Sequence, residues 1–457
     1  MSIIRVVGAG LMWNTSAVVL GKVLMFANVF LVLTGLTVYE YGFSELVLSI
    51  IAMAGVVFLP GLTAAITADM AVARGRSDFG EMSRVFHQHF LFNLILGVSA
   101  WAVLFFAALP VAQFAGTPYA AQFLQIVSFT FLLSPLRAAQ QMLASVMLRF
   151  LDQSFYSIVE ESFKLAFVVL FIVMWRWGIH GLMYAIFLSQ LAVLLVYVPR
   201  SLSAYREFSR ATVVGKYRFW DVLQAHRKWS VGASYVGTIA QNARLWIIKF
   251  FLGTEAVGLF SFAMGMFSHI SSLLPLATVL APVMPRYVDQ RDQLARILRA
   301  SVKFQAALGL FALVMAFGLT VPFVSILFPK YVDSIPLIFV FLLSIVPNSI
   351  GALFIPVFAA YKQQQSLLFA NTFKAFLMAI FLPPSILLFG LPGIGVEVFF
   401  TTVGNGIERY RRLRRLLPEF SLLLSELFRA DEREKEAMRI VYAAASKRLS
   451  GLLFWRR

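Results

Sequence analysis

The 457-residue chain is 60% hydrophobic and 13% charged, whereas a soluble domain is about 45–50% apolar and about 25% charged. This composition excludes a soluble fold and indicates a bilayer protein. The absence of cysteine excludes disulfides, thiol metal sites and thiol nucleophiles. The net charge of +17 does not indicate nucleic-acid binding, because the basic residues are concentrated in alternate loops, where they face anionic membrane lipids.

Apolar segments follow one another along the chain and predict an all-α polytopic membrane protein with about twelve transmembrane helices. The expected spans in the first half are 8–35, 43–70, 85–109, 119–147, 154–175 and 181–199. Those in the second half are 229–252, 258–284, 302–328, 335–360, 366–389 and 391–408. Because no small-residue cleavage site follows Met1, we expect an uncleaved first helix.

Basic residues mark one side of the membrane. Arg74, Arg76 and Arg84 follow the second span, whereas the loops on the opposite side hold little more than Arg176 and Lys330. Lysine and arginine are enriched in cytoplasmic loops, so both termini are predicted to be cytoplasmic. The loops on the outer side are too short to form a separate domain.

The second half of the chain repeats the first. Pro110, Tyr119, Pro135, Gly178 and Gly181 recur as Pro322, Tyr331, Pro347, Gly390 and Gly393, displaced by about 212 positions. An even number of crossings in each copy makes the repeats parallel, and we expect two six-helix bundles around a central cavity. The predicted parts are bundles over 1–200 and 229–408, a cytoplasmic linker over 201–228 and a basic amphipathic tail over 409–457.

Charged residues within the expected spans carry most of the functional information. They are Lys22, Arg137, Glu160, Glu161, Lys164, Arg244, Lys249, Lys374 and Glu397. A charge at the bilayer centre costs at least about 2.5–3.5 kcal/mol, so such residues face a partner or a wet cavity. More of them are basic than acidic, and a cavity with surplus positive charge favours an anionic ligand such as a phosphate or an acidic sugar.

Some of these charges also have a structural interpretation. Lys164 is spaced to pair with Glu160 or Glu161 on its own helix, and Lys249 is placed to reach the headgroups. Arg137 is placed to bind carbonyls of a helix broken near Pro135.

Three cations are assigned by their positions in the repeat. Lys22 and Arg244 lie in equivalent helices of the two halves, and we expect them to line the cavity. Lys374 corresponds to Lys164 in the repeat, which indicates a shared role in ligand binding or in bonding between helices.

Several segments resemble polysaccharide flippases. They are Leu36–Ser44, Gly61–Ile66, Ala71–Gly75, Phe251–Ala263 and Pro282–Pro285. On these segments the chain, over about residues 5–410, resembles the Wzx-type oligosaccharide-lipid flippases of the multidrug/oligosaccharidyl-lipid/polysaccharide superfamily. The resemblance implies transfer of an oligosaccharide linked to an isoprenoid pyrophosphate, of the undecaprenyl-pyrophosphate type, from the cytoplasmic to the outer leaflet of the inner membrane. It also implies that Lys22, Arg137, Lys164, Arg244 and Lys374 form the basic cavity that receives the headgroup.

Alternating access by the two bundles is the expected mechanism. The chain has no Gly-x-x-x-x-Gly-Lys-Ser/Thr loop, so we expect neither direct ATP coupling nor a cofactor. Glu160, Glu161 and Asp69 are candidate proton or sodium carriers. A polysaccharide polymerase and glycosyltransferases of the same pathway are candidate partners.

Three other functions remain open. A multidrug antiporter of the same superfamily would have the same architecture, but its cationic substrates favour acidic and aromatic groups over the lysines and arginines found here. A membrane glycosyltransferase or polymerase would need larger outer loops. A scaffold role has no feature in its favour.

Overall fold

The computed structural model describes residues 20–58, 66–67, 70, 73–74, 76–147, 149–207, 209, 231–274, 276–280, 284–361 and 363–421. These residues form helices joined by short turns, and no strand occurs among them, which confirms the all-α prediction. The chain divides into two compact units, Met1–Gly258 and Leu259–Arg457. Each unit is described separately below.

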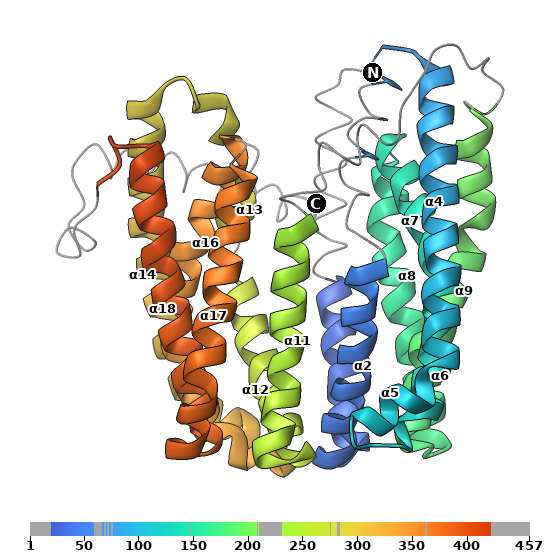
Figure 1. Cartoon of the computed structure of the whole chain (residues 1–457), viewed down its shortest axis with the longest axis horizontal. Coiled ribbons are helices and arrows are strands. Elements are labelled where there is room, and N and C mark those ends of the chain that lie inside the picture. The colour runs from blue at the N-terminus through green and yellow to red at the C-terminus, as the bar shows by residue number, and fades with distance from the viewer. Residues whose placement is uncertain are drawn as a thin grey trace, which may run out of the picture. The chain divides into compact units, whose positions relative to one another are not determined.

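The first unit is built from helices that run along its length. In chain order they are Leu20–Gly35, α2 (Val38–Phe58), α4 (Phe79–Phe106), α5 (Ala108–Phe114), α6 (Ala120–Ser128), α7 (Thr130–Val146), α8 (Phe150–Val168), the π-helical turn η1 (Val169–Met174), α9 (Gly178–Arg206) and α11 (Gly232–Leu252). In Figure 1, α8 and α9 run side by side, as do α4 and α7, and both pairs are in contact. Helix α11 packs against α2, which places it in this unit.

The second unit begins within α12 (Thr254–Ser272). Its other elements are α13 (Leu276–Leu280), η3 (Met284–Tyr287), α14 (Arg291–Leu327), η4 (Pro329–Ser334), α15 (Ile335–Leu343), α16 (Ile345–Ala360), α17 (Gln364–Phe389) and α18 (Leu391–Leu416). Helix α18 packs against α15, α16 and α17. After it, Phe420 turns back and packs on Phe354 and Tyr410, so the start of the expected tail belongs to the core of this unit.

Five described helices are long and apolar enough to cross a membrane: α2, α4, α9, α14 and α17. Helices α15 and α16 together make a sixth such segment, bent by 47° at their junction. Some helices begin before the expected spans, because they include residues that precede the apolar stretch. Helix α4 begins at Phe79 because the Asp78 carboxylate caps it, accepting a hydrogen bond from the Glu81 backbone N–H at 2.8 Å.

The repeated glycines have matching local roles in the two units. Gly178 begins α9 with φ +57°, and Gly390 precedes α18 with φ +62°, a region that only glycine adopts readily. A Cβ on Gly181 would lie 3.0 Å from Phe171, and one on Gly393 would lie 1.9 Å from the Ser385 carbonyl oxygen. These glycines therefore allow α9 and α18 to pack closely on the helical segments that precede them.

Each unit also has apolar clusters of its own. One in the first unit includes Leu36, Phe43 and Phe123, and one in the second includes Phe354, Phe358 and Leu413. The expected domain boundaries stay a prediction, since most of the linker over 201–228 and of the tail over 409–457 lies outside the described residues. Asp69 also lies outside them.

Candidate functional site

Arg137 and Glu160 form an ion pair between two helices of the first unit. Arg137 lies on α7, two residues after Pro135, and its Nη2 donates to Glu160 Oε1 of α8 at 2.5 Å. Its Nε donates to the Tyr156 hydroxyl at 3.3 Å. The two charged side chains are 20% and 23% exposed. Arg137 therefore binds a carboxylate and a phenol of the neighbouring helix, which differs from the expected contact with its own helix carbonyls.

Glu161, the second expected ion-coupling residue, contacts the first helix. The amide nitrogen of the buried Asn28 donates to Glu161 Oε2 at 2.8 Å and to the Glu161 backbone oxygen at 3.1 Å. This carboxylate is therefore held by a neutral hydrogen-bond donor. Adjacent carboxylates on α8 thus have partners on different helices.

Lys164 is electrostatically attracted to Glu45 of α2, whose side chain is also hydrogen-bonded by Tyr41. The spacing along α8 predicted pairing with Glu160 or Glu161, but Arg137 and Asn28 hold these two carboxylates. This attraction acts between α8 and α2. The choice between ligand binding and bonding between helices stays open for Lys164.

Sequence reasoning missed Asn28, Glu45 and Tyr156. Glu45 is an acidic residue inside an expected span, which is the same signal that identified Glu160 and Glu161. Its inclusion changes the charge balance, because the cluster on α2, α7 and α8 combines two cations with three carboxylates. Any surplus of positive charge therefore depends on Lys22, Arg244 and Lys374.

Those three cations lie on three different helices. Arg244 is on α11 of the first unit and is 6% exposed. Lys22 is half-buried on the helix Leu20–Gly35, and Lys374 is half-buried on α17 of the second unit. Cations on apolar helices face a partner or a polar cavity, and their heads suit oxyanions.

Lys249 and Glu397 are the other two charged residues within the expected spans. Lys249 donates to the Ala115 carbonyl oxygen at 2.5 Å and lies 5.0 Å from the Trp246 ring centroid. Its head thus reaches the turn after α5, consistent with the expected extension toward the headgroups. Glu397 is fully buried on α18. Among the described residues, no three histidine or acidic side chains gather as a metal site.

The arrangement can serve two kinds of chemistry. The carboxylates of the first unit can bind a small cation, which at Glu160 would compete with Arg137. The remaining cations can bind a phosphate by charge-assisted hydrogen bonds, in bidentate fashion for Arg244.

Comparison with known proteins supports a transport fold. A family model described as polysaccharide biosynthesis protein matches residues 31–336, which is more than half of the 457 residues. No curated protein matches the chain.

Solved structures of transporters match nearly the whole length. An inward-facing multidrug resistance MATE transporter of the MOP superfamily is 16% identical, with 87% of this chain and 95% of that chain covered at a TM-score of 0.70. The lipid II flippase MurJ in an inward closed conformation is 12% identical, with 95% and 93% covered at 0.70. A MOP superfamily transporter from Pyrococcus furiosus is 13% identical, with 92% and 96% covered at 0.63. The chain thus has the fold of these transporters.

Proposed function

The chain belongs to the polysaccharide biosynthesis protein family, and from that premise we propose that it flips an oligosaccharide linked to an isoprenoid pyrophosphate. Its relatives in structure are multi-pass membrane transporters and flippases, not enzymes. The proposed substrate is of the undecaprenyl-pyrophosphate type. It moves from the inner to the outer leaflet of the cytoplasmic membrane, with both termini of the chain in the cytoplasm. Alternating access remains the proposed mechanism.

The burial of Arg244 is the observation that supports this proposal most strongly. Its guanidinium belongs to an apolar helix and is almost wholly withdrawn from solvent, where an arginine is costly without a function. A pyrophosphate offers the planar fork of arginine several oxygens at once. Lys22 and Lys374 are proposed to act with it as point charges. Arg137 is held by the Glu160 carboxylate in this conformation, so it would reach the headgroup only after that pair opens. Lys164 is proposed to act with the other cations despite the attraction of Glu45.

A reconstituted flipping assay tests the proposal. The purified protein is placed in vesicles containing a fluorescent undecaprenyl-pyrophosphate-linked oligosaccharide, and dithionite reduction measures the fraction in the outer leaflet. We expect Arg244→Ala to slow flipping about tenfold or more, because a hydrogen bond to a charged group contributes about 1.5–3 kcal/mol. Arg244→Lys should keep part of the rate. Arg296→Ala, which alters an exposed arginine near the start of α14, is the matched control and should flip at the wild-type rate.

Normal flipping by folded Arg244→Ala would remove Arg244 from the substrate path. If the wild-type protein flips neither the fluorescent oligosaccharide lipid nor lipid II in these vesicles, the proposed substrate class is contradicted.

A cation exporter is the second candidate. The carboxylates Glu45, Glu160 and Glu161 and the likeness to a multidrug transporter favour it. Efflux of ethidium from cells that express the protein measures this activity. Strong efflux without glycolipid flipping would replace the proposed substrate by a drug-like cation.

A further inference from the structure

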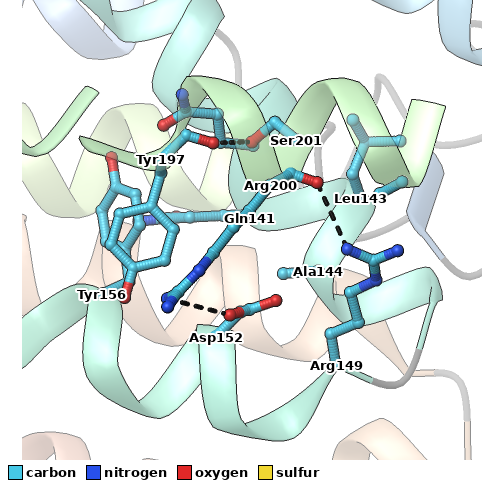
Figure 2. Close-up of a pocket in the computed structure, with 11 residues that line it drawn as sticks. Gln141, Leu143, Ala144, Arg149, Asp152, Tyr156, Tyr197, Arg200 and Ser201 are labelled. Atoms are coloured by element: carbon cyan, nitrogen blue, oxygen red, sulfur yellow. Dashed lines mark hydrogen bonds and ion pairs between the residues drawn. The ribbon is translucent and has the colours of Figure 1, made fainter. Parts of the chain in front are cut away.

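A chain of side-chain contacts runs between α7, α8 and α9, from the end of the first unit expected to face the cytoplasm into its interior. Figure 2 shows the outer part of this chain, where Arg200 of α9 reaches across to Asp152 of α8, and Tyr197 of α9 lies beside Tyr156 of α8. The inner end of the chain is the ion pair that joins α7 to α8. Each side chain in the series contacts the next one directly.

Arg200 begins the chain at the surface. Its side chain is 57% exposed, and its guanidinium lies 3.2 Å from the Asp152 carboxylate. The guanidinium carbon also lies 5.4 Å from the centroid of the Tyr197 ring, within the distance at which an aromatic face attracts a cation. The Arg200 side chain is hydrogen-bonded to the Tyr197 hydroxyl as well. Arg200 therefore holds Tyr197 from the solvent side, while Asp152 holds Arg200.

Two buried tyrosines form the middle of the chain. Tyr197 is 3% exposed and Tyr156 is 4% exposed, and together with Val193 they form a buried cluster between α8 and α9. The two ring centroids are 5.0 Å apart, with an angle of 52° between the ring planes, which is within the range that attractive aromatic pairs prefer. Because side chains in a packed interior have little room to rotate, the Tyr197 ring limits the orientations open to the Tyr156 ring.

Tyr156 passes this restriction on to Arg137. The Tyr156 hydroxyl accepts from Arg137 Nε at 3.3 Å, and Arg137 Nη2 donates to Glu160 Oε1 at 2.5 Å. Tyr156 and Glu160 are four residues apart on α8, so they lie on the same face of that helix. A guanidinium is planar and its donors are fixed relative to one another, so the bond at Nε sets the direction in which Nη2 points.

We propose that Tyr197 and Arg200 are positioning residues for the Arg137–Glu160 pair. They hold the Tyr156 ring where its hydroxyl directs the Arg137 guanidinium at the Glu160 carboxylate. The surface pair and the inner pair are then energetically coupled, although their carboxylates belong to residues about 12 Å apart along the axis of α8. Release of Arg137 toward a ligand also disturbs both tyrosines, so the cytoplasmic end of the first unit responds to the state of the inner pair. The inference does not rest on the proposed substrate.

Fluorine NMR of the purified full-length protein tests this assignment. A 3-fluorotyrosine in place of Tyr156 reports on its own hydroxyl, because the fluorine lies next to the phenol oxygen on the ring. Arg137→Leu removes the donor to this hydroxyl, and the change that it causes in the fluorine chemical shift measures the contact between the two side chains. Comparing this change between backgrounds separates it from the direct effect of a substituted neighbour on the fluorine, as in a double-mutant cycle.

Variants of Tyr197 give the main comparison. We expect the shift change caused by Arg137→Leu to be at least about threefold smaller in the Tyr197→Leu background, where the supporting ring is lost. Tyr197→Phe keeps the ring and should keep most of the change. An equal change in the wild-type and the folded Tyr197→Leu backgrounds would overturn the proposal.

Arg200→Gln provides an independent test at an exposed position. It should reduce the shift change caused by Arg137→Leu about twofold, because Tyr197 then loses its support on the solvent side. Arg206→Gln, which alters another exposed arginine near the end of α9, is the matched control and should leave the change as it is in the wild type. If Tyr197→Leu does not fold, this comparison decides, and identical results for Arg200→Gln and Arg206→Gln would contradict the positioning role.

Discussion

In the first unit, a long span is interrupted after the nine residues of α6 and continues as α7. In the second unit, α15 is also nine residues long and continues as α16 after a single residue. Helix α9 of the first unit and α18 of the second each follow a glycine-containing turn, at Gly178 and at Gly390. The two units thus share the features that set the path of the backbone.

Their polar side chains differ. Arg137 of α7 pairs across to α8, whereas Ser349, which occupies the corresponding place after Pro347 in the repeat, donates to the Val346 carbonyl oxygen of its own helix at 3.0 Å. Near the end of α9, Arg200 pairs with Asp152 of α8, whereas its counterpart Arg412, near the end of α18, pairs with Glu408 of its own helix.

The comparison indicates that the repeat preserves backbone geometry. At the two pairs of positions compared, the side chain in the first unit bonds to another helix, whereas its counterpart in the second unit bonds within its own helix. A sequence repeat therefore predicts equivalent helices but not equivalent chemistry. Substitutions at the repeated glycines and at the ion pairs of the two units test this conclusion.

The largest effect is expected at the close approach of α18 to α17. Gly393→Ala places a Cβ 1.9 Å from a backbone oxygen, which cannot move without shifting the helix. We expect a loss of about 3 kcal/mol, the upper end of overpacking costs. Gly181→Ala meets its nearest atom at 3.0 Å and should cost about 1 kcal/mol. Thermal unfolding in detergent, followed by tryptophan fluorescence, measures both.

Gly318→Ala is the matched control for this pair. It changes a glycine of α14 that has nothing within 4 Å, and higher helix propensity should leave stability unchanged or raise it by up to about 1 kcal/mol. Equal melting temperatures for Gly393→Ala and Gly318→Ala would show that the repeated glycine is not needed for packing.

A double-mutant cycle on Arg137 and Glu160 should give the next largest effect. Arg137→Leu leaves a carboxylate without its partner inside an apolar helix pair, and Glu160→Leu does the same to the guanidinium. The double variant should recover part of the loss, with a coupling energy of about 1–3 kcal/mol, because the side chains are 20% and 23% exposed and solvent screens them only in part. Additive losses in thermal unfolding would mean that the pair contributes nothing between α7 and α8.

The sequence predicted the helices and the repeat because these depend on local properties. Apolar length indicates a span, and Gly178 and Gly390 mark turns that need a positive φ. Most of the transmembrane charges were found by the same reasoning, since a charge within an apolar run is visible without a fold, although Glu45 was missed.

Their partners could not be predicted in the same way. Glu160, Glu161 and Lys164 share one helix, so spacing along the chain favoured a pair among them. The observed partners of the two carboxylates are Arg137 and Asn28, from other helices, and Lys164 is attracted to Glu45 of α2. Identifying these groups requires the rotation of each helix about its axis.

The smallest effect is expected for the pair on α18. Glu408 lies four residues before Arg412, at 2.8 Å, and the Arg412 guanidinium also lies 3.7 Å from the centroid of the Phe369 ring. A cycle of Glu408→Ala and Arg412→Ala should give a coupling of about 0.3–0.5 kcal/mol, typical of pairs within a helix. The ring contact should persist in Glu408→Ala, so Arg412→Ala should be the more destabilising single change. A coupling as large as that of Arg137 and Glu160 would remove the distinction between the two units, because an ion pair within one helix would then stabilise the fold as strongly as one that joins two.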